Sequence, residues 1–222
     1  MLRIVIGAAI TMCLASTLAE AQQSPRVFVG AVAGVSTLSA DARSEITTAG
    51  ADVSLYKPEN GPALNVLFGV QVHEYVSLQG NYVWNNNDVV LTSVRAAGGS
   101  FSVQPSKTSQ HALVGDVLAF FRDRRSALRP YLSVGIGVVR LQTRPNGEAR
   151  ARSIVVPPAN ARATGALLRV AVGIDVAVGA GWSARYSFSE SISNNPLSAQ
   201  LLPPGQRKLA NFQNLFGMVR TF

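Results

Sequence analysis

The stretch QHALVGDVLAFFRDRRSALRPYLSVGIGVV, from Gln110 to Val139, decides the fold. Read by alternate residues, each half of it has one face that carries only apolar or small side chains: Leu113, Gly115, Val117, Ala119 and Phe121, then Leu132, Val134, Ile136 and Val138. The other faces mix apolar, small, polar and charged residues: Gln110, Ala112, Val114, Asp116 and Leu118, then Tyr131, Ser133, Gly135 and Gly137. A period of two predicts β-strands, and the Arg-rich segment 122–129 between them predicts a hairpin turn.

Two architectures fit such a hairpin. A soluble sandwich would bury the apolar face against a second sheet, whereas a transmembrane barrel turns it towards lipid and keeps small and polar groups inside. The apolar stretch Ala163–Gly181 helps to decide, because it carries Arg169 and Asp175. Charges at the centre of a membrane helix are costly, and at period two both charges fall on the less apolar face. The stretch therefore also predicts a strand, and the barrel is favoured.

The N-terminus has the features of a secretory signal peptide. Arg3 gives a positive start, an apolar run follows, and Ala19-Glu20-Ala21 is a small-x-small cleavage site. The run is short for a membrane span, although a retained anchor is the alternative. We expect a signal peptide over residues 1–21, cleaved after Ala21, and one barrel domain over residues 22–222. Cys13, the only cysteine, is preceded by Met12, which argues against a lipoprotein, and the mature chain keeps the net charge of +8 because one Arg and one Glu are removed together.

Eight segments alternate at period two and are long enough to cross the membrane as tilted strands, which takes about nine to eleven residues. They are 26–37, 62–72, 76–86, the two halves of the quoted hairpin, 163–178, 182–193 and 209–222. Their connections alternate between long and short, and the long ones are Leu38–Gly61, Asn87–Thr108, Gln142–Arg162 and Asn194–Lys208. Within the second of these, 88–96 and 100–104 offer prolongations of the flanking strands. The prediction is an all-β fold, an eight-stranded antiparallel up-and-down transmembrane β-barrel with a narrow, filled interior.

The chain resembles the small outer-membrane β-barrel family of the OmpA and OmpX type. The resemblance covers 26–222 and is carried by the signal peptide, the hairpin ending in RPYLSVGIGVV and the last strand, LANFQNLFGMVRTF. It implies the bacterial outer membrane, and it implies that Gly217 and the C-terminal Phe222 form the signal read by the outer-membrane assembly machinery. Arg220 departs from the family pattern, which favours an apolar residue there. The peptidoglycan-binding module of larger relatives is not expected.

Four charged residues fall on inward faces: Asp116, Arg169, Asp175 and Arg185. An unpaired charge in a narrow interior is expensive, so we expect these residues to form an ion-paired plug. The alternative is that they line a narrow conducting path.

Five aromatic residues fall near the predicted membrane edges. Tyr82 and Trp84 lie towards the long-loop end, and Phe121, Trp182 and Phe222 lie towards the short-turn end. They are predicted to form interfacial girdles; packing in a soluble core is the alternative.

Basic residues gather around the third long loop: Arg140, Arg144, Arg150, Arg152 and Arg162. They suit anionic partners such as outer-membrane lipid and lipopolysaccharide, or an acidic surface ligand, unless they serve only solubility. Nucleic acid is not expected, because the sequence lacks an aromatic and basic platform.

Catalysis has little support in the sequence. The mature histidines are His73, in a short turn, and His111, which has Ser109 two residues before it but no assignable acidic or amide orienter. A lipid-modifying enzyme that uses His111 is the remaining enzymatic alternative, and no metal or cofactor motif is present. We expect a monomer without catalysis or cofactor, with a structural or surface-interaction role through its extracellular loops. The competing function is a narrow porin-like channel for ions or small solutes.

Overall fold

The computed structural model describes residues 26–39, 44–46, 52–95, 98–152, 160–194 and 208–222. The predicted signal peptide with its cleavage after Ala21 lies outside the described residues, as does nearly all of the loop Asn194–Lys208.

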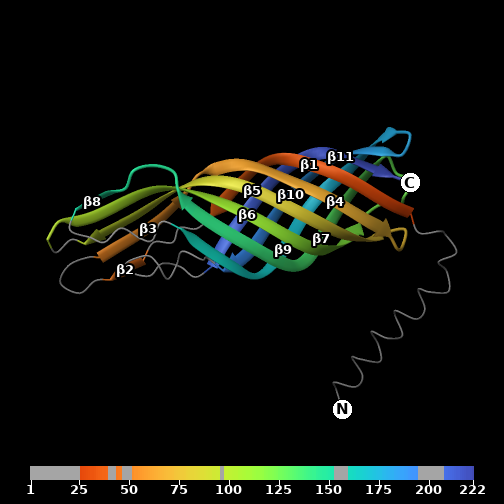
Figure 1. Ribbon diagram of the computed structural model, residues 1–222. Coiled ribbons are helices and arrows are strands. Elements are labelled where there is room, and N and C mark those ends of the chain that lie inside the picture. The colour runs from red at the N-terminus through yellow and green to blue at the C-terminus, as the bar shows by residue number, and fades with distance from the viewer. Residues whose placement is uncertain (1–25, 40–43, 47–51, 96–97, 153–159, 195–207) are drawn as a thin grey trace, which may run out of the picture.

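The described part of the chain forms one antiparallel sheet of eleven strands, eight of which close into a barrel (Figure 1). The eight are β1 (Arg26–Ser39), β4 (Asn60–Gln71), β5 (Val76–Arg95), β6 (Ser100–Phe120), β7 (Leu128–Pro145), β9 (Ala161–Gly179), β10 (Trp182–Asn194) and β11 (Lys208–Thr221). The ring runs β5-β4-β1-β11-β10-β9-β7-β6 and closes because β5 also pairs with β6. A closed ring leaves no unpaired sheet edge, which is what a spanning sheet needs in lipid. The predicted eight-stranded barrel is confirmed.

The two faces of the strands are sorted as the alternation predicted. Ile136 and Leu113, on the apolar face, are 73% and 61% exposed, while Asp116 and Leu118, on the opposite face of β6, are buried. The same pattern continues around the ring, with Val134, Leu168, Val170 and Phe68 exposed on its outer surface. The apolar groups therefore coat the outside of the barrel, and the interior takes the mixed face.

Two strands continue well past the predicted membrane region. β5 runs to Arg95 and β6 starts at Ser100, and they stay paired from Val76↔Ala119 to Arg95↔Ser100. The alternation explains this continuation, because Val89 and Leu91 are still buried on the inner face. Gly98 and Gly99 have φ values of 98° and 63° at the turn, a conformation that costs glycine little. The offered prolongations of these strands are thus real, and Asn87–Thr108 is mostly strand rather than loop.

Three short strands add to this extension. β3 (Asp52–Pro58) pairs with the end of β5, β2 (Ser44–Ile46) pairs with β3, and β8 (Arg150–Arg152) pairs with β6. They lie in segments that the sequence predicted as loops, Leu38–Gly61 and Gln142–Arg162. The exposed backbone edges of the long β5–β6 hairpin provide the hydrogen-bonding groups that these short strands use. We call this part, opposite the C-terminus in Figure 1, the extended end.

The other end of the barrel, here called the short-turn end, has tight connections. β4 joins β5 through residues 72–75, β6 joins β7 through 121–127, and β9 joins β10 through Ala180 and Gly181. Gly179, the last residue of β9, and these two residues have positive φ values, of 113°, 50° and 77°. β1 begins and β11 ends here, paired through Phe28↔Thr221. Long and short connections therefore alternate as predicted.

Candidate functional site in the barrel interior

The four predicted lumen charges lie inside the barrel and form two ion pairs. Arg169 Nη1 lies 2.9 Å from Asp116 Oδ2. Arg185 donates two parallel hydrogen bonds to Asp175, from Nε to Oδ1 and from Nη2 to Oδ2, each 2.6 Å long. All four side chains are buried. Bidentate pairing of this kind is the strongest arrangement open to an arginine and a carboxylate.

Two amides join the pairs into one network. Asn81 Nδ2 donates to Asp116 Oδ2 at 2.9 Å, and Gln79 Nε2 donates to Asn81 Oδ1 at 2.7 Å. Arg185 Nη1 then donates to Gln79 Oε1 at 2.7 Å. The network thus crosses the lumen from β6 and β9 through β5 to β10. Sequence reasoning found the charges but not the linking role of Gln79 and Asn81, although their places on the inward face of β5 were visible.

Glycines make room for the bulky members of this layer. Tyr131 lies across the strand from Gly173, and a Cβ on that glycine would collide with the Tyr131 ring. Phe28 covers Gly69 in the same way. The guanidinium of Arg185 lies 5.0 Å from the centroid of the Tyr131 ring and 5.8 Å from that of Phe28, within the range of cation–π attraction.

A second polar layer lies nearer the extended end. Ser36 Oγ donates to Asn211 Oδ1 at 2.8 Å, and Asn85 Nδ2 donates to Asn87 Oδ1 at 2.8 Å. Asn211 also reaches Gln110 Oε1, at 3.1 Å. Buried apolar residues surround this layer, and they are Leu38, Val83, Val89, Leu91, Ala112, Val114, Val139, Leu141, Ala161, Leu167 and Leu209.

Little free space remains around the charge network. A cavity bordered by Asp116, Arg169, Arg185 and Tyr131 has a volume of about 10 Å³, room for about one water molecule. Leu118, Leu215 and Ser36 are completely buried on the inner wall. The interior is therefore packed with side chains at several successive levels.

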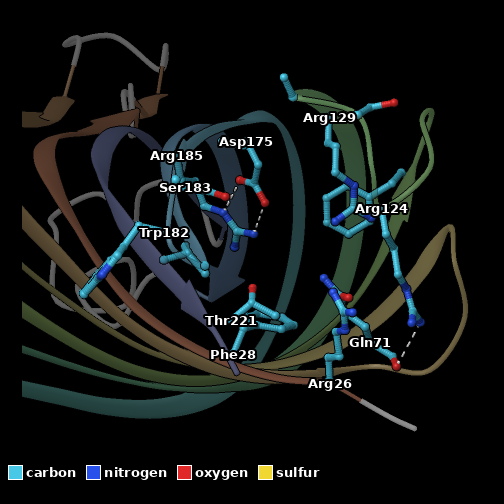
Figure 2. A pocket seen from close by; sticks show the side chains of 17 residues that line it. Arg26, Phe28, Gln71, Arg124, Arg129, Asp175, Trp182, Ser183, Arg185 and Thr221 are labelled. Carbon is cyan, nitrogen blue, oxygen red and sulfur yellow. Dashed lines mark hydrogen bonds and ion pairs between the residues drawn. The ribbon is translucent and has the colours of Figure 1, made fainter. Parts of the chain in front are cut away.

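A larger cavity opens at the short-turn end (Figure 2). Its volume is about 180 Å³, and four arginines line it: Arg26, Arg124, Arg129 and Arg185. Arg124 Nη2 donates to the Gln71 carbonyl at 3.3 Å. Burial, and then the positive charge of Arg26, lower the pKa of Arg124 below its usual value. This cluster was not predicted from the sequence, because its members come from β1, β7, β10 and a turn that only the closed ring brings together.

The predicted interfacial aromatics all lie on the outer surface or its rim. Phe121 and Phe222 are exposed at the short-turn end, Trp182 and Tyr82 are partly exposed, and Trp84 is half-buried. Arg220, the departure from the family pattern, places its guanidinium 5.4 Å from the Trp182 ring centroid and 5.0 Å from that of Phe222. The aromatic environment gives this outward-facing cation a favourable contact.

Gly217, of the predicted assembly signal, lies on β11, the strand that meets β1, and Phe222 directly follows that strand. A side chain at Gly217 would collide with the backbone of Ala31 and Val32. Phe222 N donates to the Val27 carbonyl at 2.9 Å. Gly217 thus has a steric role where β11 pairs with β1 to close the barrel, independent of any recognition by the assembly machinery.

The histidines are held by neighbouring aromatic residues and backbone. His111 Nδ1 lies 2.7 Å from the Tyr82 hydroxyl on the outer surface, and the Tyr75 backbone N–H donates to His73 Nδ1 at 3.4 Å. Over the described ranges, no group of three or more His, Cys, Asp or Glu is placed to hold a metal ion, and no helix is long and apolar enough to span a membrane.

The basic residues of the third connection are exposed. Arg140 and Arg144 alternate on the outer face of β7, Arg162 lies on β9, and Arg150 and Arg152 form the ends of β8. Gln142 is paired with Arg162 across the strands. With its amide turned to the favourable orientation, its oxygen accepts from Arg144 Nε at 2.7 Å and from Arg162 Nη2 at 3.1 Å.

Solved structures with a similar fold are outer-membrane barrels. Neisserial surface protein A (NspA) aligns with a TM-score of 0.54 and 12% identity over 90% of this chain and 100% of its own. The outer membrane protein OprG from Pseudomonas aeruginosa gives a TM-score of 0.52 and 11% identity over 89% and 95%. At such low identity the likeness shows the fold alone. No curated protein sequence matches the chain significantly.

The family comparison gives the broader result. The outer membrane protein beta-barrel domain matches residues 6–208, most of the chain. Together with the closed ring and its apolar outer surface, this shows that the chain belongs to the outer membrane protein β-barrel domain family.

Proposed function

We propose that the protein is a non-conducting outer-membrane barrel with a structural or surface-interaction role, exercised through its extended end. The packed lumen carries the proposal: two hydrogen-bonded polar layers and an apolar cluster occupy the interior, and the cavity at the charge network holds about one water. A barrel with so little wet volume has no route for solutes. The part that projects beyond the barrel is the β5–β6 hairpin with β3 and β8 (Figure 1).

The extended end then faces the outside of the cell, and the short-turn end faces the periplasm, as is usual for such barrels. The proposed orientation in the outer membrane also includes export by the predicted signal peptide, cleavage after Ala21, and assembly through the predicted signal formed by Gly217 and Phe222. It also goes with a monomer, since the described strands already close the ring without a second chain. The proposal includes no catalytic step and no cofactor.

The partner that best fits the outer surface is lipopolysaccharide. Four cations face outward on neighbouring strands, Lys107, Arg140, Arg144 and Arg162. We call them the basic rim. Asp88 lies 3.8 Å from Lys107, which leaves three of the four cations without a carboxylate neighbour within ion-pair distance among the described residues. Exposed apolar residues such as Val138 and Leu168 lie on the same strands nearer the membrane centre. Phosphate groups suit the basic rim, and acyl chains suit the wall beside it.

One experiment separates the closed barrel from a narrow channel. The purified protein, refolded and inserted into planar bilayers, should give no conductance steps, while a general porin inserted in the same membrane gives them. Regular steps from the protein alone would favour the porin-like channel and refute the closed lumen.

A second experiment tests the basic rim. The variant Arg140→Gln/Arg162→Gln should retain several-fold less lipopolysaccharide after extraction and washing than the unmodified barrel, because each charge-assisted contact to phosphate is worth about 1.5–3 kcal/mol. Arg122→Gln/Arg125→Gln removes the same charge from exposed positions at the other end and should retain the normal amount. Equal loss in both variants would show that only net charge matters.

A further inference from the structure

The cavity at the short-turn end carries an excess of positive charge. Its lining contains four arginines and one carboxylate, Asp175, so the formal sum is +4 − 1 = +3. Both oxygens of Asp175 accept from Arg185 at 2.6 Å. That carboxylate is therefore committed to Arg185, and three further arginines, Arg26, Arg124 and Arg129, line the same cavity.

Arg129 is the most confined of these three. It lies directly across the strands from Asp175, yet no ion pair joins them. Its side chain is buried, with the guanidinium 3.8 Å from the centroid of the Phe120 ring and one Nη donating to the Glu74 carbonyl at 3.2 Å. Its Nε is buried without a partner, and no carboxylate of the described residues lies within ion-pair distance of it. A buried cation in this state is costly unless an anion approaches it.

Of the two nearby acids outside the lining, Glu74 lies close enough to Arg124 to favour its charged form, and Asp123 is held by its own turn. Asp123 Oδ1 accepts from the backbone N–H of Arg125 at 3.0 Å and from the Ser126 backbone and hydroxyl at 2.9 Å each. These bonds stabilise its own turn and lower the pKa of Asp123. Neither Asp123 nor Glu74 lines the cavity.

The shape of the cavity suits a small oxyanion. A volume of about 180 Å³ would hold about six water molecules at roughly 30 Å³ each, enough for a phosphate group with part of its hydration. Figure 2 shows the side chains of Arg26 and Arg124 with Arg129 above them in the view, and the three come from different elements. Guanidinium groups bind phosphate oxygens in a forked, charge-assisted geometry.

We propose that this mouth is a binding site for a phosphate group, held by Arg129 within the cavity and by Arg26 and Arg124 at its opening. The proposal does not depend on the surface role of the extended end, which lies at the opposite end of the barrel. The phosphate is either free in solution or part of a lipid headgroup at the periplasmic leaflet, and the two sources offer the same chemistry to the arginines.

The test measures ligand-dependent stability of the folded barrel in maltoside micelles at constant ionic strength. The temperature at which the gel mobility shifts from folded to unfolded should rise with inorganic phosphate and not with chloride, because a ligand that binds only the folded state stabilises it in proportion to its occupancy. A second arm replaces inorganic phosphate by a short-chain phosphatidylglycerol. A rise in the first arm identifies free phosphate as a ligand, and a rise only in the second identifies the headgroup.

The variants decide whether the response belongs to this cavity. Arg129→Gln should weaken phosphate binding about tenfold or more, since one charge-assisted contact is lost, and Arg26→Gln should weaken it at the exposed edge. Arg122 is an exposed arginine in the same turn as Arg124, but it does not line the cavity. The variant Arg122→Gln should therefore respond to phosphate like the unmodified protein.

If Arg129→Gln does not fold, the variants Arg129→Lys and Arg26→Gln are measured in its place. No rise in either arm, or the same rise in Arg26→Gln and Arg129→Lys as in the unmodified protein, would overturn the proposal. A loss of response in Arg122→Gln equal to that in Arg26→Gln would also overturn it, because general charge would then account for the effect.

Discussion

At the scale of single residues, Asp116 and Arg169 show how the lumen tolerates charge. Their 2.9 Å pair is almost fully buried, and Asp116 also accepts from Asn81. Asp116 Oδ1 has no partner and lies against Gly135, where a Cβ would collide with it. Asn81 and Gly135 thus leave room for this ion pair and contact it. Removing one charge of the pair leaves the other charge buried without compensation.

Asp116→Asn should lower the free energy of unfolding by about 3 kcal/mol or more, because it leaves Arg169 as a buried, uncompensated cation. The double variant Asp116→Asn/Arg169→Met should be more stable than Asp116→Asn alone. Urea unfolding in lipid vesicles measures both. The control is Lys107→Met, which breaks the exposed Lys107–Asp88 contact of 3.8 Å and should change stability by less than about 1 kcal/mol. Equal values for the single and double variants would show that the two charges do not depend on each other.

Gly173 gives a second prediction at this scale. Gly173→Ala places a methyl group against the Tyr131 ring, so it should cost about 1–3 kcal/mol through overpacking. The matched control is Gly115→Ala, where no atom lies within 4 Å of the added Cβ; its effect should stay within about 0.5 kcal/mol. Unfolding free energies in the same vesicles compare them. Similar costs at both positions would mean that glycine is required for strand flexibility rather than for space.

The residues of the charge network also show how far sequence reasoning reaches. Alternation is enough to put Asp116, Arg169, Asp175 and Arg185 on inward faces, because a strand fixes side-chain direction by position alone. It does not fix which acid meets which base. That choice depends on strand neighbours and stagger in the closed ring, which bring Arg185 beside Asp175 and leave Arg129 unpaired. The arginine-lined cavity was missed for the same reason.

At the scale of elements, the β5–β6 hairpin is the main addition to the predicted fold. The eight spanning strands follow from period-two sorting and from alternating connection lengths. The prolonged hairpin was harder to predict, because Ser and Gln dominate its inward face beyond Leu91, while apolar residues such as Val94 and Phe101 lie on its outward face. Pairing with β3 and β8 supplies backbone hydrogen bonds that cannot be predicted from the local sequence of the hairpin.

Shortening the hairpin should separate its role from that of the barrel. Deleting 92–95 and 100–103 removes four residues from each arm and brings Leu91↔Gln104 next to the turn. An even number keeps every remaining side chain on its original face. The shortened protein should still fold, shown by heat-dependent gel mobility. β8 loses its partners and β3 keeps only those of Tyr56, Lys57 and Pro58, so both segments should become more accessible to protease. Loss of the folded gel form would instead make the hairpin part of the folding core.

At the scale of the whole molecule, the interior is filled at more than one level. The charge network lies nearer the short-turn end, and the Ser36–Asn85–Asn211 layer with the apolar cluster around it lies nearer the extended end. All eight barrel strands contribute to these levels. Each level is held by its own contacts. If the proposed closed lumen is correct, opening one level leaves the other in place, whereas a channel with a single salt-bridge gate would then conduct.

Asp116→Ala/Arg169→Ala should therefore remain non-conducting in planar bilayers although it widens the central level. The amide layer and buried residues such as Leu141 and Val89 still fill the lumen above it, and a narrow stretch lined by apolar side chains resists wetting. Insertion of the variant is verified by its protease pattern in lipid vesicles, and a general porin added afterwards verifies that the planar bilayer reports conductance. Conductance steps in the double variant but not in the unmodified protein would make the Asp116–Arg169 pair a gate and the remaining levels permeable. In that case the closed lumen would be a regulated state of a channel, and the narrow porin-like function would take the place of the one proposed here.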